Sequence, residues 1–149
     1  MLVNDIEGLV RLSKKPMFWR LFSRKDAPLA GAPAAPRLKT YSARSGYVYQ
    51  YRYQGSRPIQ AGPDSGVEFV FSVSADRKSW HAVEVLVSDG AIRAWEQAHA
   101  RELSSAERHA IAKMALFQAF DERPAPALMK DRVRVRPADV EAISETLDL

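Results

Sequence analysis

The chain has 149 residues, 46% of them apolar, and carries 22 Lys and Arg against 18 Asp and Glu. That length fits one domain with a tail, and that composition excludes a disordered chain. The sequence contains no cysteine, which excludes disulfides and thiolate chemistry, and no apolar run approaches the roughly 18 residues that a membrane-spanning helix needs. Because the first residues also lack the pattern of a secretory signal, we expect a cytoplasmic protein.

The charge is divided unevenly along the chain. Residues 1–60 hold 11 Lys and Arg against 3 Asp and Glu, whereas residues 61–149 hold 11 against 15. Such a division indicates either an acidic partner for the N-terminal part or attraction between the two halves of the molecule.

Residues 1–25 are predicted to form a basic, aromatic, helical arm. Apolar residues recur near helical spacing up to residue 13, and Pro16 then interrupts the pattern. A dense aromatic cluster follows between basic residues, as in segments that dock on partner proteins, anionic membranes or nucleic-acid phosphates. An alternative is that this arm packs on its own domain. The candidate partner-binding residues are Lys14, Lys15, Phe18, Trp19, Arg20, Phe22, Arg24 and Lys25.

Residues 26–36 contain three prolines among small residues, and we interpret them as an extended, weakly packing linker. The folded domain is therefore predicted to span residues 37–149, with its boundary near Arg37.

All five tyrosines fall at odd positions between residues 41 and 53. Since side chains alternate faces along a strand, a strand over about 40–54 would place four phenol rings on one face. We expect this row to cover a helix rather than to stack bases or bind a peptide or sugar. The opposite faces of the sheet are expected to be solvated because of Gln50, Arg52, Glu68, Ser72 and Glu84. Residues 55–66, with two prolines and three glycines, are predicted to be a loop.

Two alternating runs, 67–74 and 80–87, flank a polar turn and predict a β-hairpin. A helix is then expected over about 89–101, begun by Ser88 or Asp89. Ser104 and Glu107 have the spacing of a capping box, which opens a second helix over about 105–122. Residues 131–136 indicate a short edge strand, and Pro137 suits the first position of a last helix.

The predicted fold is therefore α+β. A small antiparallel sheet, a three-stranded meander with a short edge strand as a further candidate, is covered on one face by two or three helices.

Familiar catalytic and metal-binding patterns are absent from the sequence. There is no Gly-x-Ser-x-Gly elbow, no phosphate-binding glycine loop and no HExxH. His81, His99 and His109 lack the spacing of a helical metal pair, and His99 is expected to be a packed, hydrogen-bonded histidine. We accordingly predict no catalytic residues, no metal and no cofactor, and an unrecognised small enzyme is the weakest reading.

The function predicted from the sequence is a non-catalytic binding or adaptor module that contacts a partner protein or an anionic surface through its arm. Self-association through the same arm is a further expectation. The alternative is a nucleic-acid-binding protein that uses the basic arm together with Arg44, Arg52 and Arg57.

Overall fold

The structure is a computed structural model that describes residues 27–60 and 62–149. The strands are β1 (Lys39–Ser42), β2 (Val48–Ile59), β3 (Gly66–Ser74), β4 (His81–Ser88) and β5 (Val133–Val135). The α-helices are α2 (Asp89–His99), α3 (Ser105–Glu122) and α4 (Pro137–Leu147), and two short 3-10 helices are η1 (Gly62–Asp64) and η2 (Pro126–Lys130). None of the helices in the described residues is long and apolar enough to cross a bilayer.

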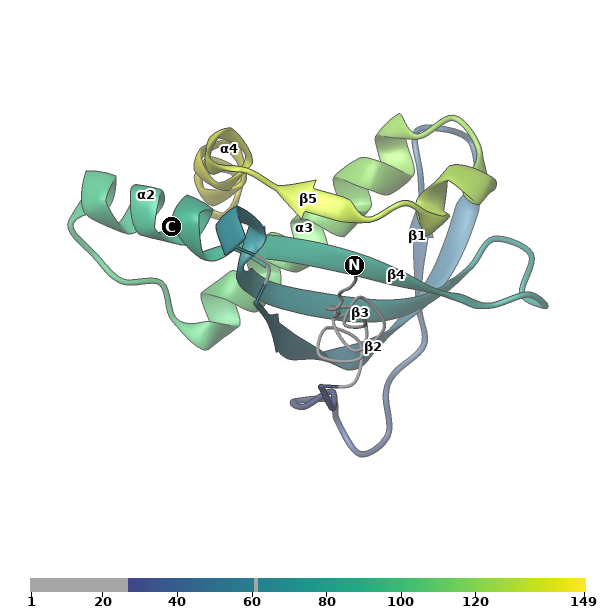
Figure 1. Cartoon of the computed structure of the whole chain (residues 1–149). Coiled ribbons are helices and arrows are strands. Elements are labelled where there is room, and N and C mark those ends of the chain that lie inside the picture. Colours follow the sequence, from purple (N-terminus) through teal and green to yellow (C-terminus); the bar gives the residue numbers. More distant parts are fainter. Residues whose placement is uncertain (1–26, 61) are drawn as a thin grey trace, which may run out of the picture.

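The five strands form one sheet in the order β1-β2-β3-β4-β5. The first three pairs are antiparallel, whereas β5 pairs with β4 in parallel. The fold is thus α+β, as the sequence predicts. The prediction of an antiparallel sheet is wrong for one pair, since β5 reaches β4 by the crossover through α2 and α3 and the sheet is therefore mixed (Figure 1).

The predicted strand over 40–54 is in fact two strands. The chain turns back at residues 43–46, where Gly46 has a positive φ of 98° and its N–H donates to the Ala43 carbonyl. Tyr41 of β1 therefore lies directly opposite Tyr49 of β2 instead of preceding it on one strand.

The predicted loop over 55–66 was wrong for its first half, since β2 continues to Ile59. The register shifts between Tyr53 and Gly55, which is a β-bulge, and Gly55 adopts a φ of 121° that favours glycine. Pro58 is tolerated because β1 pairs with β2 only as far as Tyr51 and, among the described residues, only Ala30 bridges to that side of β2 beyond the bulge, at Ser56, so the missing N–H of Pro58 leaves no ladder bond unmade.

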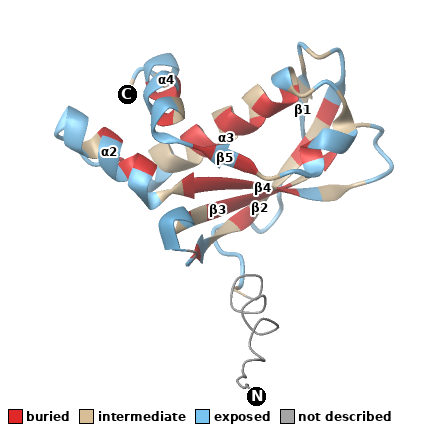
Figure 2. Ribbon diagram, turned by 45° about the horizontal axis from the view of Figure 1, so that its top comes forward, coloured by how far each residue is buried: buried red, intermediate tan, exposed pale blue. Residues whose placement is uncertain are grey.

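The three α-helices lie on one side of the sheet, and the buried residues concentrate between the two layers (Figure 2). Tyr49 and Tyr51 are almost fully buried, and Tyr49 stacks on Phe120 of α3 with ring centroids 4.2 Å apart. Tyr47, by contrast, is 39% exposed at the start of the row. Most of the tyrosine row thus packs against α3, as expected.

The helix boundaries follow from their caps. The Ser88 hydroxyl accepts from the Ala91 N–H at the start of α2, and Ser104 and Glu107 form a complete capping box before α3. Pro137 occupies the first position of α4. These three starts agree with the sequence.

Candidate functional site

A cavity of about 640 Å³ lies between the sheet, the N-terminal half of α3 and the segment over residues 31–38, which we call the strap. The bulge in β2 creates the space. Ala30 exchanges two hydrogen bonds with Ser56, and the chain does not pair with β2 again until β1 begins at Lys39. The strap, with Pro33 and Pro36 in it, therefore spans this gap without joining the sheet.

The floor of the cavity is aromatic. Tyr51 and Tyr53 of β2 lie beside Phe69 and Phe71 of β3, and all but Tyr53 are at most 6% exposed. The Tyr53 and Phe71 ring centroids are 5.4 Å apart. Because these rings pack on one another and on the core, they form a rigid apolar surface that needs no rearrangement to contact a ligand.

His109 of α3 forms one wall. Its ring meets that of Tyr53 edge-on, with centroids 4.4 Å apart, and lies 5.8 Å from that of Phe69. Burial lowers the pKa of His109 below its ordinary value, and the positive charges of Lys113 and Lys39 lower it further. The imidazole is accordingly neutral near pH 7.

Four cations also line the cavity: Arg37 in the strap, Lys39 in β1, and Arg108 and Lys113 in α3. Arg108 is 3.3 Å from Glu96. No acidic residue among the described ones lines the cavity, and Arg37, Lys39 and Lys113 have no ion pair within residues 27–60 and 62–149. The pKa of Lys113 is lowered, first by burial and then by Lys39. The cavity thus joins an apolar floor to a positive charge that no acidic residue in the described part of the chain compensates.

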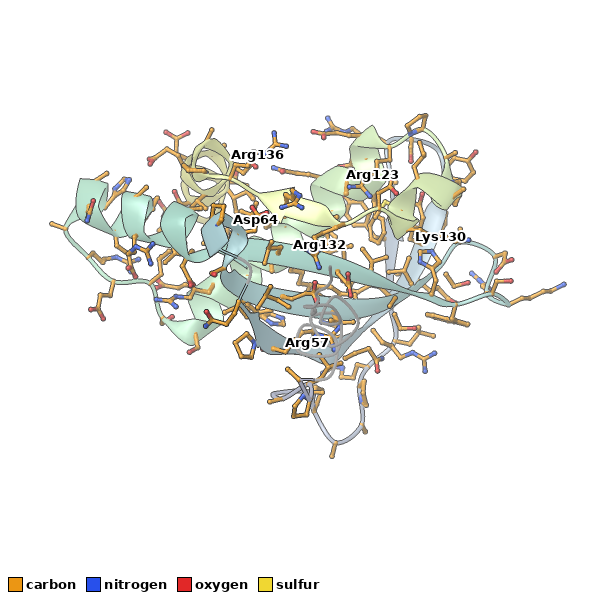
Figure 3. The ribbon with its side chains drawn as sticks, in the orientation of Figure 1. Arg57, Asp64, Arg123, Lys130, Arg132 and Arg136 are labelled. Atoms are coloured by element: carbon orange, nitrogen blue, oxygen red, sulfur yellow. The ribbon has the colours of Figure 1, made fainter. Side chains whose placement is uncertain are left out.

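The opposite face of the sheet carries a different charge arrangement (Figure 3). Glu68 is 1% exposed, which overturns the expectation that this position is solvated. Its carboxylate accepts from Arg57 at 3.0 Å and from Arg132 at 2.5 Å, and both arginines also approach Glu84, at 3.4 and 3.5 Å. Since every one of these charges has opposite partners, the cluster is satisfied within the fold and does not offer free charge to a ligand.

A smaller groove of about 280 Å³ lies among α3, β5 and the start of α4 and is rich in arginine. Arg123 donates to the carbonyl groups of Leu128 and Asp131, both at 2.8 Å, and thereby holds the turn before β5. Arg134 lies 3.3 Å from Asp64. Most of this positive charge is therefore already engaged within the fold.

The other histidine on a helix serves packing. His99 stacks on Trp95, with ring centroids 4.2 Å apart, and its Nε2 is 2.9 Å from Glu141. Among the described residues, no group of three or more His, Cys, Asp or Glu is arranged to hold a metal ion.

The candidate residues of the arm, Lys14 to Lys25, lie outside the described residues. The three arginines of the nucleic-acid alternative, Arg44, Arg52 and Arg57, each contact a different part of the fold. Arg44 is highly exposed in the β1–β2 turn, 3.7 Å from Asp121, whereas Arg52 lies over the Trp80 ring at 4.5 Å and Arg57 belongs to the Glu68 cluster.

The cavity itself was not found from the sequence, although one signal for it exists. His109, Lys113 and Phe117 follow one another at four-residue intervals along α3, so they share one line beside the apolar stripe. A half-buried line with a cation in it indicates contact with something other than the core. Arg37 and Lys39 gave no comparable signal, because they reach the cavity from the strap and from the start of β1, through contacts between distant parts of the chain.

Comparison with known proteins adds no relative, since no family model, no curated protein and no solved structure matches this chain.

Proposed function

We propose that this protein is a non-catalytic binding module whose ligand enters the cavity between the strap, the sheet and α3. The observation that carries the proposal is the combination of an open cavity, a preformed aromatic floor and cations with no acid partner in the described part of the chain. Its volume falls in the range of about 300–1,000 Å³ that is typical of small-molecule sites.

The chemistry of the lining supports binding rather than catalysis. Ser56, Ser105 and the two tyrosines supply hydroxyls, but no hydrogen bond within the described residues joins any of them to His109. The described lining also holds no carboxylate that could orient the imidazole or act as a base. A nucleophile activated by a base, which covalent catalysis requires, is thus not assembled there.

Blocking the cavity tests the proposal. Ala106 is an exposed residue at the second position of α3 and lines the cavity, so Ala106→Trp should fill the entrance at small cost to the fold. Ala138 is exposed at the second position of α4, away from the cavity, and Ala138→Trp is the matched control.

The measurement is the fluorescence of a neutral apolar dye, Nile red, titrated with the full chain. We expect enhanced fluorescence with the unmodified protein and with Ala138→Trp, and its loss with Ala106→Trp. Equal enhancement by both variants, or none with the unmodified chain, would refute the cavity as the ligand site.

We also propose, from the sequence, that the arm contacts an acidic partner protein or an anionic surface through residues 14–25, which lie outside the described residues. The salt dependence of binding distinguishes this proposal from the nucleic-acid alternative. Binding to DNA or RNA through phosphate contacts should weaken steeply as salt rises, whereas an aromatic protein interface should depend on salt far less. Absence of retention on DNA and RNA at low salt would remove the alternative.

A further inference from the structure

Lys39 and Lys113 reach the same cavity from opposite walls. Lys39 is the first residue of β1, directly opposite Tyr51, and Lys113 lies at the middle of α3 with its Nζ 6.0 Å from the Phe117 ring centroid. Lys113 is half-buried, and neither ammonium has an acid partner among the described residues. Two like charges that line the same cavity beside an apolar floor repel one another; the pKa of Lys113 is lowered first by burial and further by the positive charge of Lys39.

An anion is the group that would relieve this repulsion. Charge-assisted hydrogen bonds from ammonium to an oxyanion are roughly twice as strong as neutral ones, and they strengthen further where water is partly excluded. The floor of Tyr53, Phe69 and Phe71 lies in the same cavity and is apolar, so the charge must be carried by a molecule that also has a substantial apolar part. An inorganic anion alone would leave the floor uncovered.

We propose, resting on the function proposed above, that the cavity binds an amphipathic oxyanion, whose carboxylate or phosphate head lies between Lys39 and Lys113 and whose apolar body covers the aromatic floor.

Binding of the anion is expected to be coupled to protonation of the His109 imidazole. An anion bound beside His109 favours its charged form, so binding takes up a proton as the pH falls through the ordinary histidine range of about 6.5. Affinity for the anion should therefore rise between pH 7.5 and 5.5, and a His109→Gln variant should lose most of that rise.

A matched pair of probes separates the head from the body. 2-Naphthoate and 2-naphthamide have nearly the same shape and differ in charge, and calorimetric titration of the full chain at pH 7 and low salt measures both. We expect the carboxylate to bind about tenfold or more tightly than the amide, with 2-naphthyl phosphate at least as tight as the carboxylate. A preference for inorganic phosphate over all three would overturn the amphipathic part of the inference.

The lysine is tested by Lys113→Met, which keeps the apolar stem and removes the charge. It should lower the affinity for 2-naphthoate several-fold, part of the way to that of the amide because Lys39 remains, and leave the affinity for the amide unchanged. Lys130→Met, at an exposed position in η2 away from the cavity, is the control and should change neither. Equal binding of both naphthalenes by the unmodified chain would overturn the anion inference while leaving the binding function intact. If neither binds, the proposed function fails as well.

Discussion

The hydroxyl of Tyr49 is a buried polar group that has no partner among residues 27–60 and 62–149. The side chain is fully buried, its hydroxyl has no hydrogen bond in the described part of the chain, and its ring stacks on Phe120. A buried, unsatisfied hydroxyl costs about 1–3 kcal/mol, while the ring contributes its packing whether or not the oxygen is present. We therefore expect Tyr49→Phe to increase the free energy of unfolding by about 1 kcal/mol.

Tyr41 provides the matched comparison, since it belongs to the same aromatic row and contacts the same helix. Its hydroxyl donates to Asp121 at 2.8 Å, and its ring stacks on Phe117. Tyr41→Phe removes a bond to a charged group at a partly exposed position, so it should lower the free energy of unfolding by about 1 kcal/mol. The same Tyr→Phe substitution is thus expected to raise the free energy of unfolding at position 49 and to lower it at position 41.

Urea unfolding of the full chain, followed by tryptophan fluorescence, measures both effects, because neither substitution touches a tryptophan. The dependence of the unfolding free energy on urea should be unchanged, so the midpoints carry the result. If Tyr49→Phe lowers the stability by more than about 0.5 kcal/mol, the hydroxyl has a partner and the reasoning from burial is refuted.

Other substitutions test other contacts by the same unfolding measurement. Glu68→Gln leaves two arginines without their shared buried carboxylate and should cost about 3–5 kcal/mol; a loss below about 1 kcal/mol would show that the cluster is dispensable. A Cβ at Gly66 would lie 2.3 Å from the Val87 carbonyl oxygen, so Gly66→Ala should cost about 1–3 kcal/mol, whereas Gly90→Ala, with open space in α2, should gain up to about 1 kcal/mol; equal effects would contradict the steric argument. Because the pKa of His109 is lowered in the folded state, the unfolded chain binds a proton first as the pH falls, and stability should decrease below about pH 6.5. His109→Gln should reduce that loss between pH 7.5 and 5.5, and an unchanged loss would show that His109 titrates normally.

The sequence predicted the helices and the central hairpin well because their signals are local. The capping box of Ser104 and Glu107 and the proline at the first turn of α4 each act within four residues. The alternation over 67–74 and 80–87 fixed which faces of β3 and β4 meet the helices. Such features depend on the chain near them and not on the rest of the fold.

The rest depended on contacts between distant parts of the chain. Whether residues 40–54 are one strand or two was decided by pairing between Tyr41 and Tyr49, and the extension of β2 past Gly55 needed the facing β3. Glu68 looked solvated because one of the arginines that cover it, Arg132 beside β5, is 64 residues away in sequence. The cavity escaped prediction for the same reason, since it exists only where the strap stands away from the bulged strand.

The order of strands in the sheet is the order in which they occur in the chain (Figure 1). Up to β4, each new strand can add to the one just before it, so closing these loops costs little entropy. The parallel partner β5 joins β4 only across all of α2 and α3, and this closure is the slow, non-local one. During folding, the antiparallel strands would therefore expose the face that carries the tyrosines for the longest time. Packing of α3 on this face is then the step that protects the folding chain from association with other chains.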